Sequence, residues 1–272
     1  MLPYFKGYKM AVYVVAAIAP FAVLYAWSAL AGRNMFATLE GMVALVVVFF
    51  ACLLGLSRVL GSKADQKADA LVSLYNDACD PPAFLEQGEP LAQVIEPPYT
   101  EAGSWFLSFY ALALDDVGRT SEAATIGTAM VEGAKHAPNP AMRAGLLINM
   151  EPVVVRLFGP EAALGVIDEA EAALKQAGAQ LDDRENFLTW ERAILQARRD
   201  GNYEELLSRF TQIYPSASYL PRMRVQAAAE VASILRRRGD VAGERAALAF
   251  VVEHGNRLPA VREARERLTA LE

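Results

Sequence analysis

Two uncharged runs near the start of the chain precede a long series of amphipathic segments. Residues 10–32 carry no charged side chain, and a second uncharged run over 41–57 is flanked by further apolar residues within 36–60. A helix of the first run would reach roughly 35 Å, and the hydrocarbon core of a bilayer is about 30 Å thick. The pattern therefore predicts two membrane-spanning helices, at about 10–32 and 36–60, that form an antiparallel hairpin within residues 1–62.

A buried helix of a water-soluble protein and a cleaved signal peptide are the alternatives for these runs. Two runs joined by a short connection argue against buried soluble helices, and the first run is too long for a signal peptide. Basic residues gather before the first run and after the second, so we expect both termini in the cytoplasm. They are Lys6, Lys9, Arg58, Lys63 and Lys67, against Arg33 alone in the connection.

Small residues in the first run suggest a close helix contact. Ala22, Ala26 and Ala29 form a strip for packing, either inside the hairpin or against another subunit. Pro20 lies at mid-span and predicts a kink.

The rest of the chain shows helical periodicity and no strand pattern, which predicts an all-α fold. Residues 63–100 are expected to form an amphipathic stalk helix followed by a proline-rich linker with room for one short helix. Residues 101–272 are expected to form a helical-repeat domain. The helices expected there cover 101–117, 120–134, 141–158, 160–176, 184–200, 203–213, 222–238, 241–254 and 260–271.

Four glycines mark a repeat in this domain. Gly118, Gly159, Gly201 and Gly239 each fall between two predicted helices, at spacings of 41, 42 and 38 residues. One helix pair cannot bury its apolar face alone, whereas stacked pairs form a continuous core. The period therefore predicts an α-solenoid of about four helix pairs, with 260–271 as a capping helix.

The third pair carries residues typical of the tetratricopeptide repeat, and the first pair matches that pattern in part. They are Trp190, Ile194, Gly201, Asn202, Tyr203, Glu204, Glu205, Leu206 and Phe210 in the third pair, and Tyr110, Leu114, Gly118, Arg119, Glu122 and Ala123 in the first. The domain thus resembles a tetratricopeptide-repeat (TPR-like) solenoid. The resemblance implies a right-handed superhelix with a concave face lined by first helices, protein binding, and no catalytic residues.

Charge divides the chain further. The net charge of −6 resolves into +4 for residues 1–63 and −10 for the remainder, while residues 220–272 hold ten arginines and seven acids. An acidic domain repels phosphates, so we expect no nucleic-acid partner. Several arginines fall near the ends of first helices and could grip a carboxylate or an acidic peptide. They are Arg156, Arg198, Arg199, Arg236 and Arg237; the alternative is that they complement helix dipoles and neighbouring acids.

No catalytic or metal-binding motif emerges from the sequence. His136 and His254 each close a predicted helix, where a cation complements the dipole, and the two cysteines have no zinc-site spacing. The acid pairs Asp115–Asp116 and Asp182–Asp183 are expected on a solvated surface. We therefore expect no enzyme and no cofactor.

These observations favour a bacterial cell-membrane protein that acts as an adaptor or scaffold on the cytoplasmic side. Its partners would be the bilayer and an unidentified protein or peptide. The alternative is a structural or assembly subunit of a larger membrane complex, held there by its hairpin.

Overall fold

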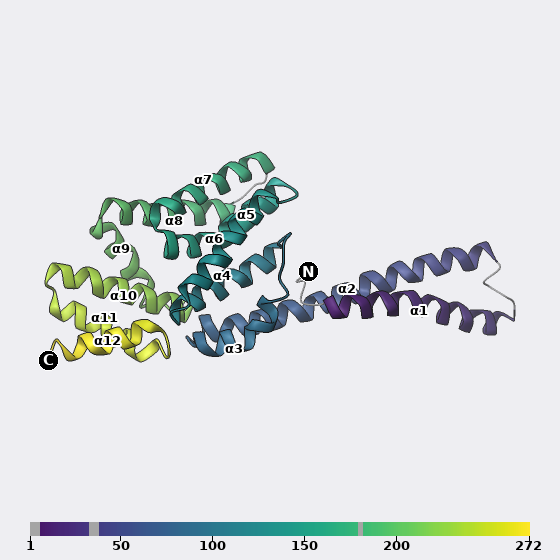
Figure 1. The fold of residues 1–272 in the computed structure, drawn as a ribbon, viewed down its shortest axis with the longest axis horizontal. Coiled ribbons are helices and arrows are strands. Elements are labelled where there is room, and N and C mark those ends of the chain that lie inside the picture. Colours follow the sequence, from purple (N-terminus) through teal and green to yellow (C-terminus); the bar gives the residue numbers. More distant parts are fainter. Residues whose placement is uncertain (1–5, 33–37, 179–181) are drawn as a thin grey trace. The chain divides into compact units, whose positions relative to one another are not determined.

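The computed structural model describes residues 6–32, 38–178 and 182–272, with side chains for 14–30, 32, 38–55, 65–178 and 187–272. These residues form helices and their connections, with no strand among them, so the fold is all-α as predicted. The chain divides into two compact units, residues 1–67 and 68–272. Figure 1 shows their helices, α1 to α12, in chain order.

The first unit consists of α1 (Lys6–Ala31) and the first part of α2 (Leu39–Asn76). Among the side chains of α1 that the structure describes, Ala16, Pro20 and Leu24 are buried; they recur every four residues and therefore share one helix face. Pro20 lies inside α1, and the helix continues on both sides of it. The alanine strip of the sequence analysis is exposed, so the contact face of α1 does not include it.

No helix in the part of the chain that the structure describes is both long enough and apolar enough to cross a membrane. The predicted spans, 10–32 and 36–60, lie partly outside the described side chains, which cover 14–30, 32 and 38–55 in this region. The two helices themselves are present where the pattern predicts them.

The second unit is built from paired helices. The pairs are α4 (Glu101–Asp116) with α5 (Thr120–Lys135), α6 (Pro140–Phe158) with α7 (Pro160–Ala177), α8 (Asp182–Asp200) with α9 (Tyr203–Ile213), and α10 (Pro221–Arg238) with α11 (Val241–His254). α12 (Pro259–Thr269) packs on α11, and α4 also packs on α6, the first helix of the next pair. Helices α4 to α12 begin and end within two residues of the bounds predicted from the sequence.

The turns between paired helices rely on the four periodic glycines. Gly118, Gly159, Gly201 and Gly239 all have positive φ, between 66° and 88°, which an L-residue with a Cβ adopts only at a cost. Polar residues begin the helices: Thr100, for example, accepts a hydrogen bond from the backbone N–H of Gly103 at 3.0 Å. The glycine period therefore has a local physical cause in the backbone.

The segment expected to be a linker contains α3 (Pro81–Ala92), which packs against α4. Two prolines stand at its start, where their missing N–H groups cost nothing, and Asp80 caps it. Phe84 is fully buried and stacks at 5.7 Å from the ring of Tyr75, near the end of α2. The end of α2 and the buried face of α3 thus belong to the core of the second unit.

Candidate functional site

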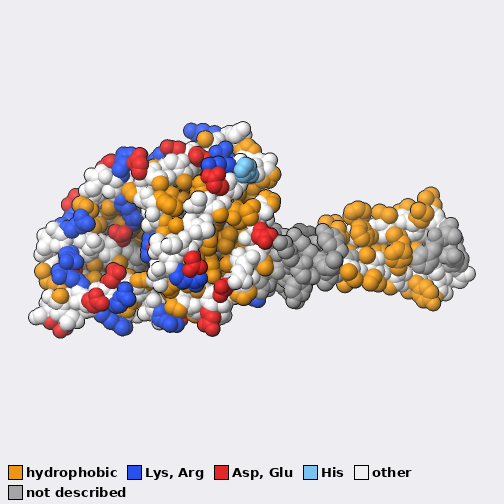
Figure 2. Space-filling model, viewed as in Figure 1, with side chains coloured by type: hydrophobic (Ala, Val, Ile, Leu, Met, Phe, Trp, Pro, Cys, Tyr) orange, Lys and Arg blue, Asp and Glu red, His pale blue; other side chains and the backbone are white. Residues whose placement is uncertain are grey.

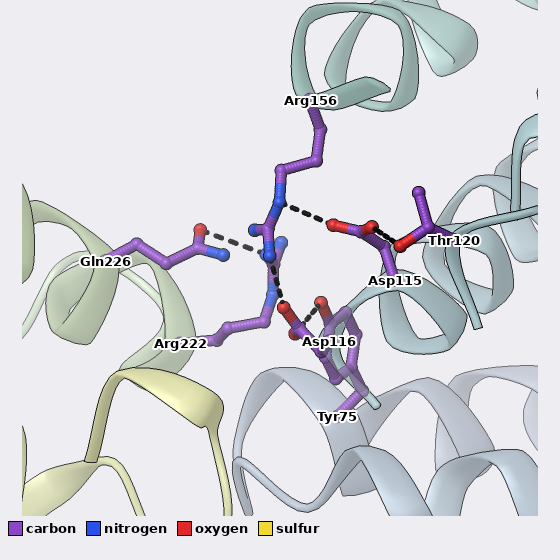
Figure 3. Close-up of polar contacts among 7 residues, drawn as sticks. All are labelled: Tyr75, Asp115, Asp116, Thr120, Arg156, Arg222 and Gln226. Carbon is purple, nitrogen blue, oxygen red and sulfur yellow. Dashed lines mark hydrogen bonds and ion pairs between the residues drawn. The ribbon is translucent and has the colours of Figure 1, made fainter. Parts of the chain in front are cut away.

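A polar cluster joins helix ends that are far apart in the sequence (Figure 3). It combines the last turns of α2, α4 and α6 with the first turn of α10. We call it the hub, and its residues are Tyr75, Asn76, Asp115, Asp116, Arg156 and Arg222.

Arg156 holds the two acids of α4 together. Its Nε lies 2.8 Å from Asp115 Oδ2, and its Nη2 donates to Asp116 Oδ1 at 2.7 Å. Asp116 also accepts a hydrogen bond from the hydroxyl of Tyr75 at 2.7 Å, and Asp115 accepts one from Thr120 at 2.7 Å. Both acids are therefore committed to contacts inside the chain.

Arg222 brings α10 into the hub. Its side chain is buried, its Nε donates to Asn76 Oδ1 at 2.8 Å, and its Nη1 donates to Gln226 Oε1 at 3.0 Å. The guanidinium lies over the ring of Tyr75, 4.7 Å from its centroid, and over Phe109 at 5.6 Å. Cation–π contacts of this kind gain strength where water is excluded.

Burial sets the protonation of the hub. Burial raises the pKa of Tyr75 far above its usual range, so its hydroxyl stays protonated and acts as a hydrogen-bond donor. Burial of the Arg156 guanidinium alone would lower its pKa, but the nearby Asp116 and Asp115 carboxylates outweigh this effect and raise it. The positive charges of Arg156 and Arg222 equal the negative charges of Asp115 and Asp116 in number. The hub is therefore neutral, as expected for a structural contact between helices.

A second, acidic cluster lies between α6 and α8. Glu151 is almost fully buried, and its Oε1 has no hydrogen-bond partner among the described residues. Burial, and then the nearby Glu191, raises the pKa of Glu151 to about 8, against the opposing effect of Arg198. Burial also raises the pKa of Glu191, to about 7. At least one of these carboxyl groups therefore holds a proton near neutral pH.

The structure does not gather the five candidate arginines into one site. Arg156 belongs to the hub, and Arg198 pairs with Glu230 of α10 at 2.9 Å. The other three lie near the ends of α8 and α10: Arg199 pairs with Asp200, Arg237 donates to the hydroxyl of Tyr203, and Arg236 is exposed with no ion pair to any described residue. Their role in partner binding stays a prediction.

The prediction of a solvated surface for Asp115 and Asp116 was wrong. The side chain of Asp116 is only 3 % exposed and that of Asp115 only 15 %, because Arg156 and Tyr75 cover them. The other acid pair, Asp182–Asp183, lies outside the described side chains.

No family model, curated protein or solved structure matches the chain. Among the described residues, no group of three or more His, Cys, Asp or Glu side chains could hold a metal ion. Burial raises the pKa of the Cys79 thiol to about 11, which keeps it in the unreactive thiol form at neutral pH.

The sequence pattern does not mark the hub residues Tyr75, Asn76 and Arg222 as a site. A buried arginine needs partners, yet Arg222 finds Asn76 at a separation of 146 residues, which no local pattern encodes. The sequence holds one signal for the hub: the adjacent acids Asp115 and Asp116 end a predicted helix, and Arg156 occupies the corresponding place in the next repeat.

Proposed function

We propose that this protein is a membrane-anchored, TPR-like adaptor whose helical-repeat domain holds other proteins at the cytoplasmic face. The observation that carries the proposal is the outer surface of the first unit. Apolar side chains are exposed around both of its helices, including Leu30 at 89 % and Leu39 at 79 %. Figure 2 shows hydrophobic side chains, in orange, over much of the coloured part of this unit.

Such a surface is stable only in apolar surroundings. A helix that is hydrophobic all round is typical of a membrane span, and a soluble monomer seldom exposes an apolar patch of this extent. Residues 14–30 and 41–55 also contain no charged side chain. A lipid bilayer would surround the exposed apolar side chains of both helices at once. The basic residues that flank the two helices would then lie on the cytoplasmic side.

The repeat domain supports the adaptor part of the proposal. Its helices stack as pairs, and solenoids of this kind offer extended surfaces for protein binding. Arg236 is exposed at the end of α10 and has no ion-pair partner among the described residues, so its guanidinium is available to a carboxylate. An acidic protein segment is the partner that fits.

Membrane attachment is tested with the full chain carrying a reporter after Glu272. We expect the protein to sediment with membranes and to stay there after an alkaline carbonate wash, because two spans are not released by disrupting surface charge contacts. Release by carbonate would contradict the anchor. A reporter active only outside the cytoplasm would overturn the orientation.

Partner binding is tested by photo-crosslinking from exposed Ser233, which lies on α10 one turn before Arg236 and Arg237. We expect crosslinks to a protein partner that disappear in the double variant Arg198→Glu, Arg236→Glu. The matched control reverses the same charge on exposed α12 residues, Arg262→Glu with Arg265→Glu, and keeps the crosslinks. If the crosslinks persist in the Arg198→Glu, Arg236→Glu variant, the proposal of an acidic partner is wrong.

A structural subunit of a larger membrane complex is the second candidate. The observation that favours it is the exposed strip of Ala22, Ala26 and Ala29, which the contact face of α1 leaves free for another helix. Scrambling the two spans while keeping their hydrophobicity separates the candidates. Function that survives scrambling indicates an anchor, and function that is lost indicates helix packing within a complex.

A further inference from the structure

Two segments from opposite ends of the second unit meet in space. The backbone N–H of Arg257 donates to the carbonyl of Cys79 at 3.1 Å, and the side chain of Asn256 donates to the carbonyl of Ala78 at 2.7 Å. Arg257 also reaches the carboxylate of Asp80 at 3.2 Å. We call residues 78–80 and 255–257 the clasp. It joins the turn after α2 to the turn between α11 and α12.

The joint between the two ends of the second unit includes a further polar contact. Beyond the clasp, it is made by Arg222 of α10, which bonds Asn76 and covers the rings of Tyr75 and Phe109. α11 packs on both of its neighbours in sequence, α10 and α12. Hydrogen bonds and one buried guanidinium therefore contribute to the contact between the two ends of the second unit.

Backbone strain coincides with the clasp. Cys79 has φ 53° and Asn256 has φ 46°, and they are the only non-glycine residues with positive φ that the structure describes. A left-handed conformation costs a residue such as cysteine on the order of 1 kcal/mol and persists only where neighbouring contacts impose it. Strain of this kind concentrates in switch regions. Here the two strained residues lie on facing sides of one contact.

We propose that the clasp is a reversible closure that opens as a local unit while the helix pairs stay folded. On opening, water replaces the hydrogen bonds that Arg257 donates to Cys79 and Asp80. Opening frees the turn between α11 and α12 from the end of α2, while Arg222 keeps α10 in the hub. Under the proposed adaptor function, on which this step alone rests, a partner segment that binds the open form shifts the population toward it.

Hydrogen exchange of single amides on the full chain in detergent micelles tests the closure. The amide of Arg257 reports directly on the clasp because it donates to Cys79, and the amide of Ile167 reports on the fully buried centre of α7. We expect the open form seen by Arg257 to be at least roughly 100-fold more populated than the one seen by Ile167. Equal opening at both amides would overturn the proposal, since the clasp would then open only by global unfolding.

A variant makes the test specific. Arg257→Ala removes the ion pair with Asp80 and keeps the backbone donor, so exchange at residue 257 should rise by up to about fivefold while exchange at Ile167 stays constant. Arg262→Ala, an exposed arginine on α12, is the matched control and should change neither amide. An equal rise at 257 and 167 would overturn the local closure.

Salt provides an independent arm. High salt should speed exchange at residue 257 in the wild-type chain and have little effect in Arg257→Ala, because the Arg257 side chain is more than half exposed and salt therefore screens its pair with Asp80. The same salt response in both proteins would contradict the role of this pair. None of these measurements requires a membrane or a partner. A result that contradicts the clasp opening therefore leaves the adaptor proposal standing, and a failure of the adaptor proposal leaves the clasp opening standing.

Discussion

Asp116 shows how one buried carboxylate can join three helices. It accepts hydrogen bonds from Tyr75 of α2 and Arg156 of α6, and it is itself on α4. When one member of such a network is removed, the others stay buried without a hydrogen-bond or charge partner. The loss in the free energy of unfolding then exceeds the net stabilisation that the intact contact gives.

We therefore predict that Asp116→Ala lowers the free energy of unfolding by about 3 kcal/mol, since Tyr75 loses its acceptor and Arg156 half of its carboxylate partners. Urea denaturation followed by circular dichroism measures the change. Asp200→Ala is the matched control, because its pair with Arg199 is exposed on both sides and should leave the unfolding midpoint unchanged. Equal effects of the two variants would mean that the hub is not a structural joint.

Glu151 gives the protein a pH-dependent stability. Its pKa is higher in the folded chain than in the unfolded chain, so folding takes up a proton. The stabilisation is complete below the unfolded pKa of about 4.3 and is lost as the pH rises through about 8.

We predict that Glu151→Gln flattens this dependence, because glutamine is neutral at every pH. Relative to wild type, the variant should gain stability between pH 6 and pH 9, as measured by urea midpoints at both values. Glu161→Gln, on an exposed position of α7, should keep the wild-type slope. A wild-type slope in Glu151→Gln would contradict the assignment of the proton to this cluster.

At the scale of helices, the turn glycines are a measurable requirement. An added Cβ meets no atom within 4 Å at either Gly159 or Gly165, but Gly159 has φ +88° while Gly165 lies inside α7. We predict that Gly159→Ala destabilises the fold by about 1–2 kcal/mol and that Gly165→Ala stabilises it by up to about 1 kcal/mol. Thermal unfolding measures both, and shifts of the same sign would show that space rather than φ controls these positions.

Helix bounds were predictable because local chemistry marks them. The segment predicted at 101–117 is α4, Glu101–Asp116, between the cap at Thr100 and the positive φ of Gly118. α3 was less evident because its prolines suggest a linker, although Pro81 stands at a helix start. The hub and the clasp lay beyond sequence reasoning, since their contacts join residues 40 to 178 positions apart.

At the scale of the whole chain, the boundary between the two units falls inside a helix. α2 runs from Leu39 to Asn76, yet its residues from Ala68 onward belong to the second unit. Leu71, Val72 and Tyr75 are buried there, and Tyr75 carries the hydroxyl that Asp116 needs. The last turns of α2 are thus core elements of the repeat domain rather than a spacer before it.

This placement predicts how truncations will behave. A fragment of residues 64–272 should unfold cooperatively with the helix content of the second unit, because it keeps these buried side chains. A fragment of residues 81–272 loses them and should be less stable by roughly 5 kcal/mol, at about 1.5–3 kcal/mol for each large apolar side chain withdrawn from the core. Thermal unfolding by circular dichroism compares the two. Equal stability would show that α2 only connects the units, and that the domain begins after the turn at Cys79.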